Sequence, residues 1–274
     1  MATPDKIRRP AVAGQFYPSL RGELIKQISS FIDNKARKQD IIACVLPHAG
    51  YIYSGAVAVE TLSRAEVKSR AILLGPNHTG YGARYSIMTE GSWQTPLGTA
   101  RIDTYLAGRI AESSEYLEAD EGAHEHEHSL EVELPLLQYF KEDIRIVPII
   151  LMPGELTALK DIGRGIAEAI IKDKAREEIL IVASSDMTHY EPQEEAEKKD
   201  REAIKAILEL DEEGLMESVA RLNISMCGYA PVITMISAAK ALGAKKAELI
   251  RYRTSADITK DKSSVVGYAG MIIY

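Results

Sequence analysis

Three of the six histidines stand close behind short apolar runs of the sequence. With the runs that precede them, they are His48 after residues 41–46, His78 after residues 71–74 and His189 after residues 179–183. Ligands of open α/β sheets bind beyond the carboxyl ends of the strands, so these positions indicate one shared site. Neutral imidazole is a common metal ligand. His48 and His78 could therefore bind a metal ion, or they could be ordinary hydrogen-bonded histidines of loops.

Asp186 and His189 form a second candidate element, three residues apart in the sequence Asp-Met-Thr-His. A carboxylate can orient the tautomer of an imidazole, and both groups can serve as general acid or base. We expect Asp186 to orient His189. The structural alternative is that Asp186, or a serine before it, caps the Glu-rich helix that follows.

Residues 121–128 read Glu-Gly-Ala-His-Glu-His-Glu-His. For His124 and His126, a solvated acidic loop is the favoured interpretation over a metal site. His128 differs because it precedes Ser129 at the entry of an expected helix, where it could be anchored. Pro135 is expected to break or kink that helix, because proline lacks a backbone N–H.

The two cysteines have different surroundings. Cys44 lies within the apolar run 41–46, which indicates a small core residue. Cys227 lies before an expected helix at residues 231–242, and a helix N-terminus lowers the pKa of a thiol. Cys227 could thus be a nucleophile or a soft metal ligand, or an inert half-buried thiol. Tyr51, near the first histidine, could position a ligand or simply cover apolar surface.

The composition excludes several classes of protein. The 274 residues carry a formal net charge of -7, which disfavours nucleic-acid and anionic-membrane partners. The sequence has no apolar run of about 18 residues, and its first six residues lead into no signal-peptide core. Two cysteines are most simply reduced thiols of a cytoplasmic protein. Phosphate-loop, dinucleotide-binding and Gly-x-Ser-x-Gly motifs are absent from the sequence.

The elements that must position these residues alternate between strands and helices. Buried strands are expected at residues 41–46, 71–74, 144–151, 179–183 and 265–274, and helices at 20–32, 156–171, 194–210, 211–219 (capped by Asp211) and 231–242. This alternation predicts one α/β domain, residues 1–274, with a central mostly parallel or mixed sheet flanked by helices. Residues 77–100 and 113–129 are expected to be long irregular connections.

Taken together, six motifs of this sequence resemble those of the Memo family, also called AmmeMemoRadiSam system protein B. They are RPAVAGQFYP (9–18), PHAGYIYSG (47–55), LGPNH (74–78), EHSLEVELP (127–135), SSDMTHY (184–190) and MCGY (226–229). The resemblance implies a fold similar to the class III extradiol dioxygenases. It also implies metal ligation by His48, His78 and Cys227, and a pocket with His128, Asp186 and His189. We assign Phe16, Tyr51 and Asn77 to ligand contact, with Phe16 at the pocket mouth.

The resemblance favours a metal-dependent oxidoreductase that acts on a small-molecule or peptide ligand, with a radical SAM protein as partner. A thiolate in place of the dioxygenase glutamate makes the site softer. We therefore expect Fe(II) first, then copper or zinc. The main alternative is a non-catalytic ligand- or peptide-binding module on a dioxygenase fold. A zinc hydrolase is a third interpretation, although the sequence has no His-Glu-x-x-His motif.

Overall fold

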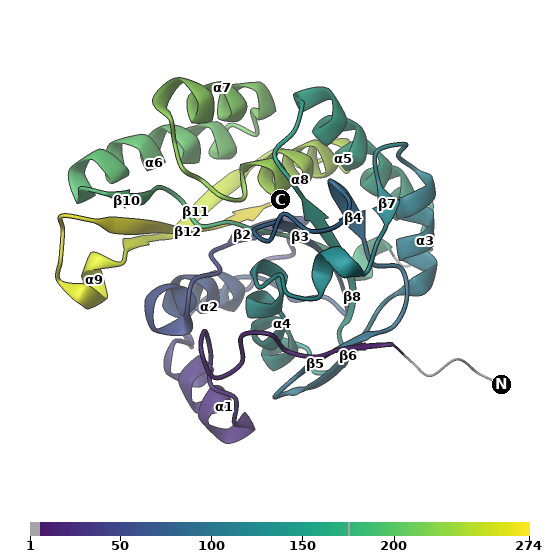
Figure 1. Cartoon of the computed structure of the whole chain (residues 1–274), viewed down its shortest axis with the longest axis horizontal. Coiled ribbons are helices and arrows are strands. Elements are labelled where there is room, and N and C mark those ends of the chain that lie inside the picture. Colours follow the sequence, from purple (N-terminus) through teal and green to yellow (C-terminus); the bar gives the residue numbers. More distant parts are fainter. Residues whose placement is uncertain (1–5, 175) are drawn as a thin grey trace.

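The computed structural model describes residues 6–174 and 176–274 (Figure 1). The expectation that residues 1–5 begin no signal peptide lies outside these residues. The strands are β1 (Ile7–Arg8), β2 (Ala43–Leu46), β3 (Arg70–Pro76), β4 (Tyr85–Ile87), β5 (Ser92–Thr95), β6 (Gly98–Arg101), β7 (Glu118–Ala119), β8 (Arg145–Leu151), β9 (Ile179–Ser184), β10 (His189–Glu191), β11 (Ala247–Thr254) and β12 (Val265–Ile273). The helices are α1 (Arg21–Ser30), α2 (Ala56–Ser63), α3 (Thr104–Glu112), α4 (Ser129–Phe140), α5 (Leu156–Ile171), α6 (Gln193–Leu208), α7 (Glu212–Leu222), α8 (Tyr229–Ala241) and α9 (Ala256–Thr259).

The main sheet is mixed, with the strand order β10-β12-β2-β9-β3-β8-β4-β7 and with β11 paired to β12. The four central strands, β2, β9, β3 and β8, run parallel. Strand β12 pairs antiparallel to β2, and β4 pairs antiparallel to β8. A small separate sheet joins β1, β5 and β6. The prediction of an α/β fold with a central mostly parallel or mixed sheet is therefore confirmed.

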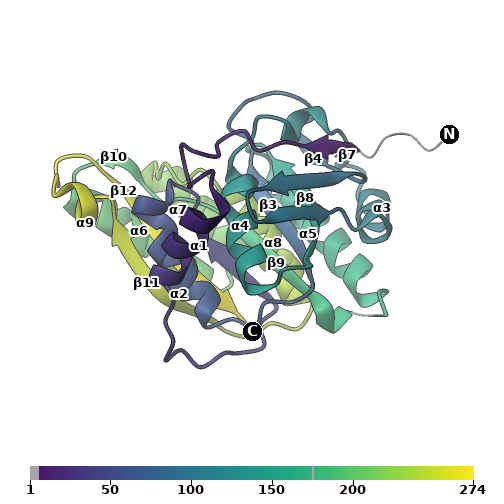
Figure 2. The ribbon, with the colours of Figure 1, turned by 90° about the horizontal axis from the view of Figure 1, so that it is seen from below.

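Helices cover both faces of this sheet. Helices α1, α2 and α4 pack on one face, and α5, α6, α7 and α8 pack on the other (Figures 1 and 2). Because the central strands are covered on both sides, their side chains are buried without alternation. Strand β9, for example, is buried at every position from Ile179 to Ser184. This is the sequence pattern expected of parallel strands inside an α/β domain.

The apolar runs predicted as strands are all strands in the structure, namely β2, β3, β8, β9 and β12. The five predicted helices are also present, as α1, α5, α6, α7 and α8. The side chain of Asp211 accepts the backbone N–H of Gly214 at 3.0 Å and caps α7, as predicted. Cys44 is fully buried in β2, which confirms it as a core residue.

Two stretches predicted as irregular connections contain regular structure. Residues 77–100 hold β4 and β5 and the start of β6, because β5 and β6 form a hairpin that also binds the N-terminal strand β1. Residues 113–129 hold the short strand β7 and one turn of 3-10 helix at Gly122–His124. Short strands of mixed polarity lack the apolar run on which the prediction depended.

Helix α4 continues through Pro135, so the proline does not break the helix as it was expected to do. Its residues from Ser129 to Gln138 are all buried between the sheet and the neighbouring helices. An internal proline costs a helix about 3 kcal/mol. Packing on all sides of α4 outweighs that local cost.

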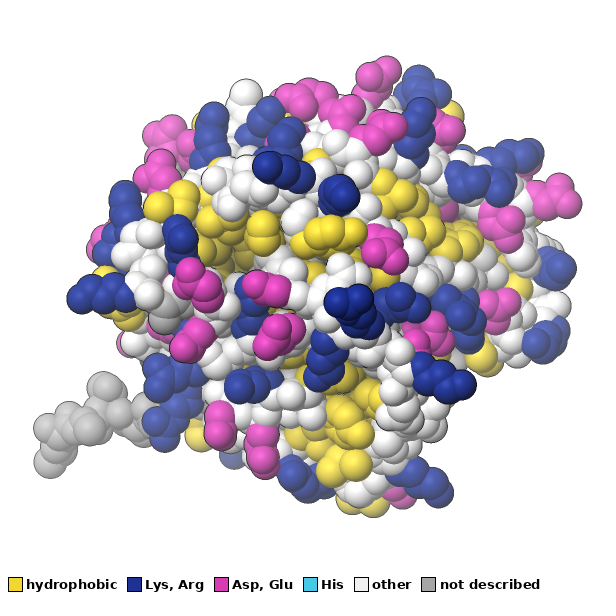
Figure 3. Space-filling view, turned by 180° about the vertical axis from the view of Figure 1, so that it is seen from behind, with side chains coloured by type: hydrophobic (Ala, Val, Ile, Leu, Met, Phe, Trp, Pro, Cys, Tyr) yellow, Lys and Arg dark blue, Asp and Glu magenta, His cyan; other side chains and the backbone are white. Residues whose placement is uncertain are grey.

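The surface carries charges of both signs. On the face turned away in Figure 1, Lys and Arg side chains alternate with Asp and Glu side chains, with hydrophobic patches between them (Figure 3). In the part of the chain that the structure describes, no helix has both the length and the apolar character needed to span a membrane.

Candidate metal centre

Sheet topology brings the histidine loops together. Strands β2, β9 and β3 are neighbours and run parallel, so the loops that follow them leave from the same edge of the sheet. His48 stands two residues after β2, and His78 stands two residues after β3. The loop after β9 carries Asp186 and leads to His189 at the start of β10.

Cys227 reaches the same edge from the loop before α8. Gly228, which follows it, donates its backbone N–H to Ser185 Oγ at 3.0 Å. A Cβ at Gly228 would overlap the Ser184 carbonyl oxygen and the Ser185 side chain. A glycine at this position therefore lets the loop approach the end of β9 closely enough to deliver the thiol.

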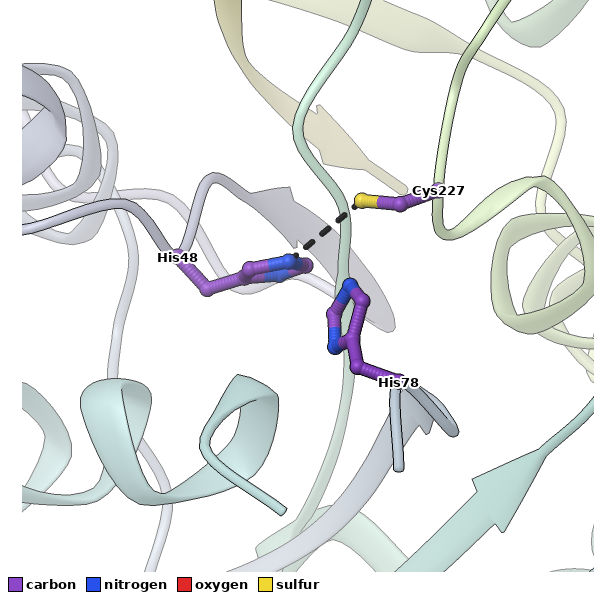
Figure 4. Close-up of side chains that lie close together, drawn as sticks. All are labelled: His48, His78 and Cys227. Atoms are coloured by element: carbon purple, nitrogen blue, oxygen red, sulfur yellow. Dashed lines mark hydrogen bonds between the residues drawn. The ribbon is translucent and has the colours of Figure 1, made fainter. Parts of the chain in front are cut away.

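The three predicted metal ligands lie together. One ligand atom from each of His48, His78 and Cys227 lies within 4.8 Å of the other two. Cys227 Sγ is 3.3 Å from His48 Nε2, and the two imidazole rings are 5.2 Å apart, edge to face. Figure 4 shows the three side chains pointing toward one another. Two ligands held about 2.0–2.3 Å from one metal lie at most about 4.6 Å apart, so these separations are close to what one shared ion requires.

His48 is held neutral with one nitrogen free for a metal. Burial lowers the pKa of His48, and the imidazoles of His78, His128 and His189 lower it further. Its Nδ1 is 2.8 Å from Ser184 Oγ. A proton on Nδ1, donated to Ser184, leaves the Nε2 lone pair directed toward Cys227. This is the tautomer that a metal ligand needs.

A buried glutamate engages the Nδ1 atom of His78. Glu127 Oε1 is 2.8 Å from His78 Nδ1, and Glu127 Oε2 accepts the backbone N–H of His78 at 2.5 Å. Burial acts to raise the pKa of Glu127, but the hydrogen bond and the electrostatic attraction of His78, together with the Ser129 backbone N–H, outweigh burial and hold the pKa at about 2. Carboxylate–histidine–metal arrangements of this kind fix the ring and its tautomer.

The thiol of Cys227 corrects one prediction. Burial raises the pKa of Cys227, and the nearby Asp186 carboxylate raises it further. Hydrogen bonds with the Ser185 side chain and with the backbone act in the other direction but are outweighed, so the pKa is raised and not lowered as expected. The metal-free thiol is therefore protonated near neutral pH, and a bound metal ion would deprotonate it.

The donor set fits a transition metal. Two imidazoles and one thiolate suit iron, copper or zinc better than magnesium or calcium. Both imidazoles present Nε2, because Ser184 and Glu127 engage their Nδ1 atoms. The residues present therefore match the group that the sequence implies.

The predicted acid and base residues lie beside this centre but do not pair as expected. Asp186 accepts the backbone N–H of His48 at 2.9 Å, and burial raises its pKa to about 6. His189 Nδ1 is 2.8 Å from the Ser225 carbonyl oxygen, and its backbone N–H donates to Ser225 Oγ. Ser225, rather than Asp186, thus orients the His189 ring.

His128 completes a group of three imidazoles. Its ring stacks on His78 at 4.6 Å and lies edge-on to His48 at 5.6 Å. Its Nδ1 is 3.5 Å from Glu127 Oε1, and burial lowers its pKa. The Phe16 ring lies 4.9 Å from the His128 ring, on the border of the site.

Two residues assigned to ligand contact have other partners. Tyr51 is buried in the hydrophobic core, and its hydroxyl donates to the Val132 carbonyl at 2.8 Å, so the structure uses it for packing rather than ligand contact. The side chain of Asn77 forms the turn after β3, where it donates to the Tyr81 carbonyl and accepts the Gly80 N–H.

The histidines of the acidic tract differ from one another. His126 is exposed, as expected of a solvated loop. His124 is fully buried, and its Nε2 is 2.9 Å from Ser86 Oγ, so the prediction of a solvated side chain was wrong for this residue. Burial, with Arg8 nearby, lowers the pKa of His124 to about 3. The 3-10 turn at Gly122–His124 folds this side chain inward.

Three buried glutamates were missed by the sequence reasoning. Glu127, Glu131 and Glu133 are each fully buried around the start of α4. Glu133 Oε1 lies 2.9 Å from Ser184 Oγ, and burial raises the pKa of Glu133 well above its usual value. The sequence did contain a sign of them, because Glu131 and Glu133 interrupt an apolar segment that includes Leu130 and Leu134.

The fold and the site together define an α/β protein with a His/His/Cys cluster at the carboxyl edge of its central parallel strands. The family model of the Memo-like protein matches residues 8–272. A MEMO1 family protein of Methanocaldococcus jannaschii is 44% identical over 98% of this chain and 99% of that relative. Those of Methanopyrus kandleri and Methanosarcina barkeri are 40% and 42% identical, each over 97% of this chain and at least 98% of the relative. The chain belongs to the Memo-like family.

Proposed function

We propose that the protein binds one transition-metal ion through His48, His78 and Cys227 and acts as an oxidoreductase. Iron(II) is the first candidate, and copper is the second. The observation that carries the proposal is the convergence of three donor atoms, with the Nδ1 atoms of both imidazoles engaged by Ser184 and Glu127. A bound iron or copper ion would supply one-electron and Lewis-acid chemistry at this edge of the sheet.

The other polar residues fit the handling of substrate and protons. Asp186, with a pKa of about 6, can exchange its proton near neutral pH, which is the property required of a general acid or base. His128 borders the same centre, next to the rings of His78 and His48, where it can donate a hydrogen bond or stack on a planar ligand. Phe16 next to it favours a ligand with an apolar or aromatic part.

The proposal extends to the related fold, the partner, the substrate and the role of His189. A fold similar to the class III extradiol dioxygenases and a radical SAM partner are consistent with the family resemblance. The substrate would be a small aromatic compound or a modified protein side chain. His189 would assist proton transfer, held in place by Ser225 rather than by Asp186.

Metal content tests the proposal. Protein without a His tag is reconstituted anaerobically with Fe(II), desalted and subjected to elemental analysis. About one iron per chain is expected in the wild type and in the control His126→Ala, which removes an exposed histidine of the acidic tract. His48→Ala and Cys227→Ala should each lose the iron. Iron content near zero in the wild type, or unchanged in these two variants, would refute the proposal.

Two other functions make different predictions for metal content and for ligand binding. A binding module would retain no stoichiometric metal and would bind an aromatic or anionic peptide equally well with and without added Fe(II). A zinc hydrolase is compatible with the two imidazoles and one thiolate, because zinc accepts this donor set. Elemental analysis of protein purified without a His tag and without added metal separates the zinc enzyme from the iron enzyme, whereas direct competition would not, because Zn(II) binds such a donor set more tightly than Fe(II) in either case.

A further inference from the structure

Arg8 occupies an unusual position for an arginine. It ends the short strand β1 and is only 7% exposed. Its guanidinium donates three hydrogen bonds of 2.7 Å, to the carbonyl of His124, the carbonyl of Glu127 and the carboxylate of Glu131. It also lies over the Trp93 ring, 4.2 Å from the ring centroid. One side chain thus binds both ends of the segment that carries Glu127 and His128.

Glu131 extends this clamp to the N-terminal segment. Its carboxylate accepts the backbone N–H groups of Ala11 and Val12 at 2.8 and 2.9 Å, and the Tyr17 hydroxyl at 2.8 Å. The side chains of Arg8 and Glu131 are 4% and 1% exposed, so their ion pair is shielded from water. The pair joins the segment that holds Phe16 to the start of α4.

Glu127 connects this clamp to the metal centre. Its backbone carbonyl is bound by Arg8, while its side chain binds the imidazole and backbone N–H of His78. The orientation of the Glu127 carboxylate therefore depends on a backbone that Arg8 holds. A planar guanidinium can reach all three acceptors at once, which the single ammonium of a lysine cannot do.

We propose that Arg8 is a positioning residue for the metal centre, acting through Glu127 on the tautomer and orientation of His78. The proposal rests on the proposed metal-binding function. In this role Arg8 acts indirectly and needs no contact with the metal ligands. Arg8 instead fixes the loop from which the supporting carboxylate of His78 projects, while the ion pair with Glu131 prevents that loop from separating from the N-terminal segment.

Two variants test this role, Arg8→Lys and Arg8→Met/Glu131→Gln. Arg8→Lys retains the charge but not the planar fork. Arg8→Met leaves the Glu131 carboxylate buried without a cation and could fail to fold, so Arg8→Met/Glu131→Gln removes both charges and keeps an acceptor for the N-terminal segment. Metal affinity is measured by chelator competition with Co(II). We expect Arg8→Lys and the double variant to fold and to bind Co(II) about 10–100-fold more weakly than the wild type and the His126→Ala control.

A second measurement separates this inference from the proposed function. Long-range nitrogen–proton NMR of the metal-free protein reports the tautomer of His78 without any metal. The wild type should show the proton on Nδ1, and Arg8→Lys should show a mixture of tautomers. An unchanged tautomer with unchanged Co(II) affinity in folded variants would overturn the role of Arg8, even if the wild type binds metal. A wild type that binds no metal, with a tautomer that still depends on Arg8, would refute the metal function alone.

Discussion

The support of His78 by Glu127 leads to a sharp prediction for the substitution Glu127→Gln. The carboxylate accepts hydrogen bonds from the His78 ring, the His78 backbone N–H and the Ser129 backbone N–H. A glutamine offers one acceptor and one donor. In one orientation its NH2 group faces the His78 ring and favours a proton on Nε2, which removes the lone pair needed by a metal ion; in the other it faces the His78 backbone N–H, which pushes that loop away.

The substitution should lower both the metal affinity and the free energy of unfolding, and both effects can be worked out. Loss of an outer carboxylate partner typically lowers metal affinity 10–100-fold. The pKa of Glu127 is about 2, compared with an ordinary value of 4.5, and one pKa unit corresponds to about 1.4 kcal/mol. The ionised carboxylate therefore stabilises the folded protein by about 3 kcal/mol. Because the pKa is depressed, this stabilisation is complete above pH 4.5 and disappears as the pH falls toward 2.

Two assays check this prediction for Glu127→Gln. Chelator competition with Co(II) measures the affinity, and urea unfolding between pH 7 and pH 3 measures the free energy of unfolding. The variant should bind Co(II) at least ten-fold more weakly and should lose less stability than the wild type as the pH falls through 4. Equal affinity together with an acid profile identical to that of the wild type would refute the reasoning.

Two further predictions concern the same edge of the sheet. Burial raises the pKa of Asp186 to about 6, so its ionisation should make the metal-free protein less stable as the pH rises from about 4 to 6. Asp186→Asn should abolish this loss of stability and be about 2–3 kcal/mol more stable than the wild type at pH 7. If urea unfolding of the variant still shows the loss of stability, another group causes it. Gly228→Ala should lower the free energy of unfolding by about 1–3 kcal/mol, because its Cβ would overlap Ser184 and Ser185. The same change should weaken Co(II) binding. An unchanged thermal unfolding temperature would show that the loop can move away without cost.

Much of the fold could be predicted because the central strands are buried on both faces. A strand in that position must be apolar throughout, and such a run is visible in the sequence without knowledge of its neighbours. The short strands β4, β5 and β6 were missed because each is stabilised by pairing rather than by an apolar run of its own. Helix α4 likewise depends on its surroundings, since packing overrides the local preference of Pro135.

The sequence alone placed His48, His78 and His189 behind strands, because the carboxyl ends of parallel strands are where side chains can leave the core. The family resemblance added Cys227 to this group, but only the structure shows that it lies 3.3 Å from His48, 179 residues away in the chain. Nor could the sequence show that Glu127 supports His78 or that Arg8 is buried against Glu131. Those contacts depend on strand order and on loops fixed by packing, and neither is encoded in the local periodicity of the chain.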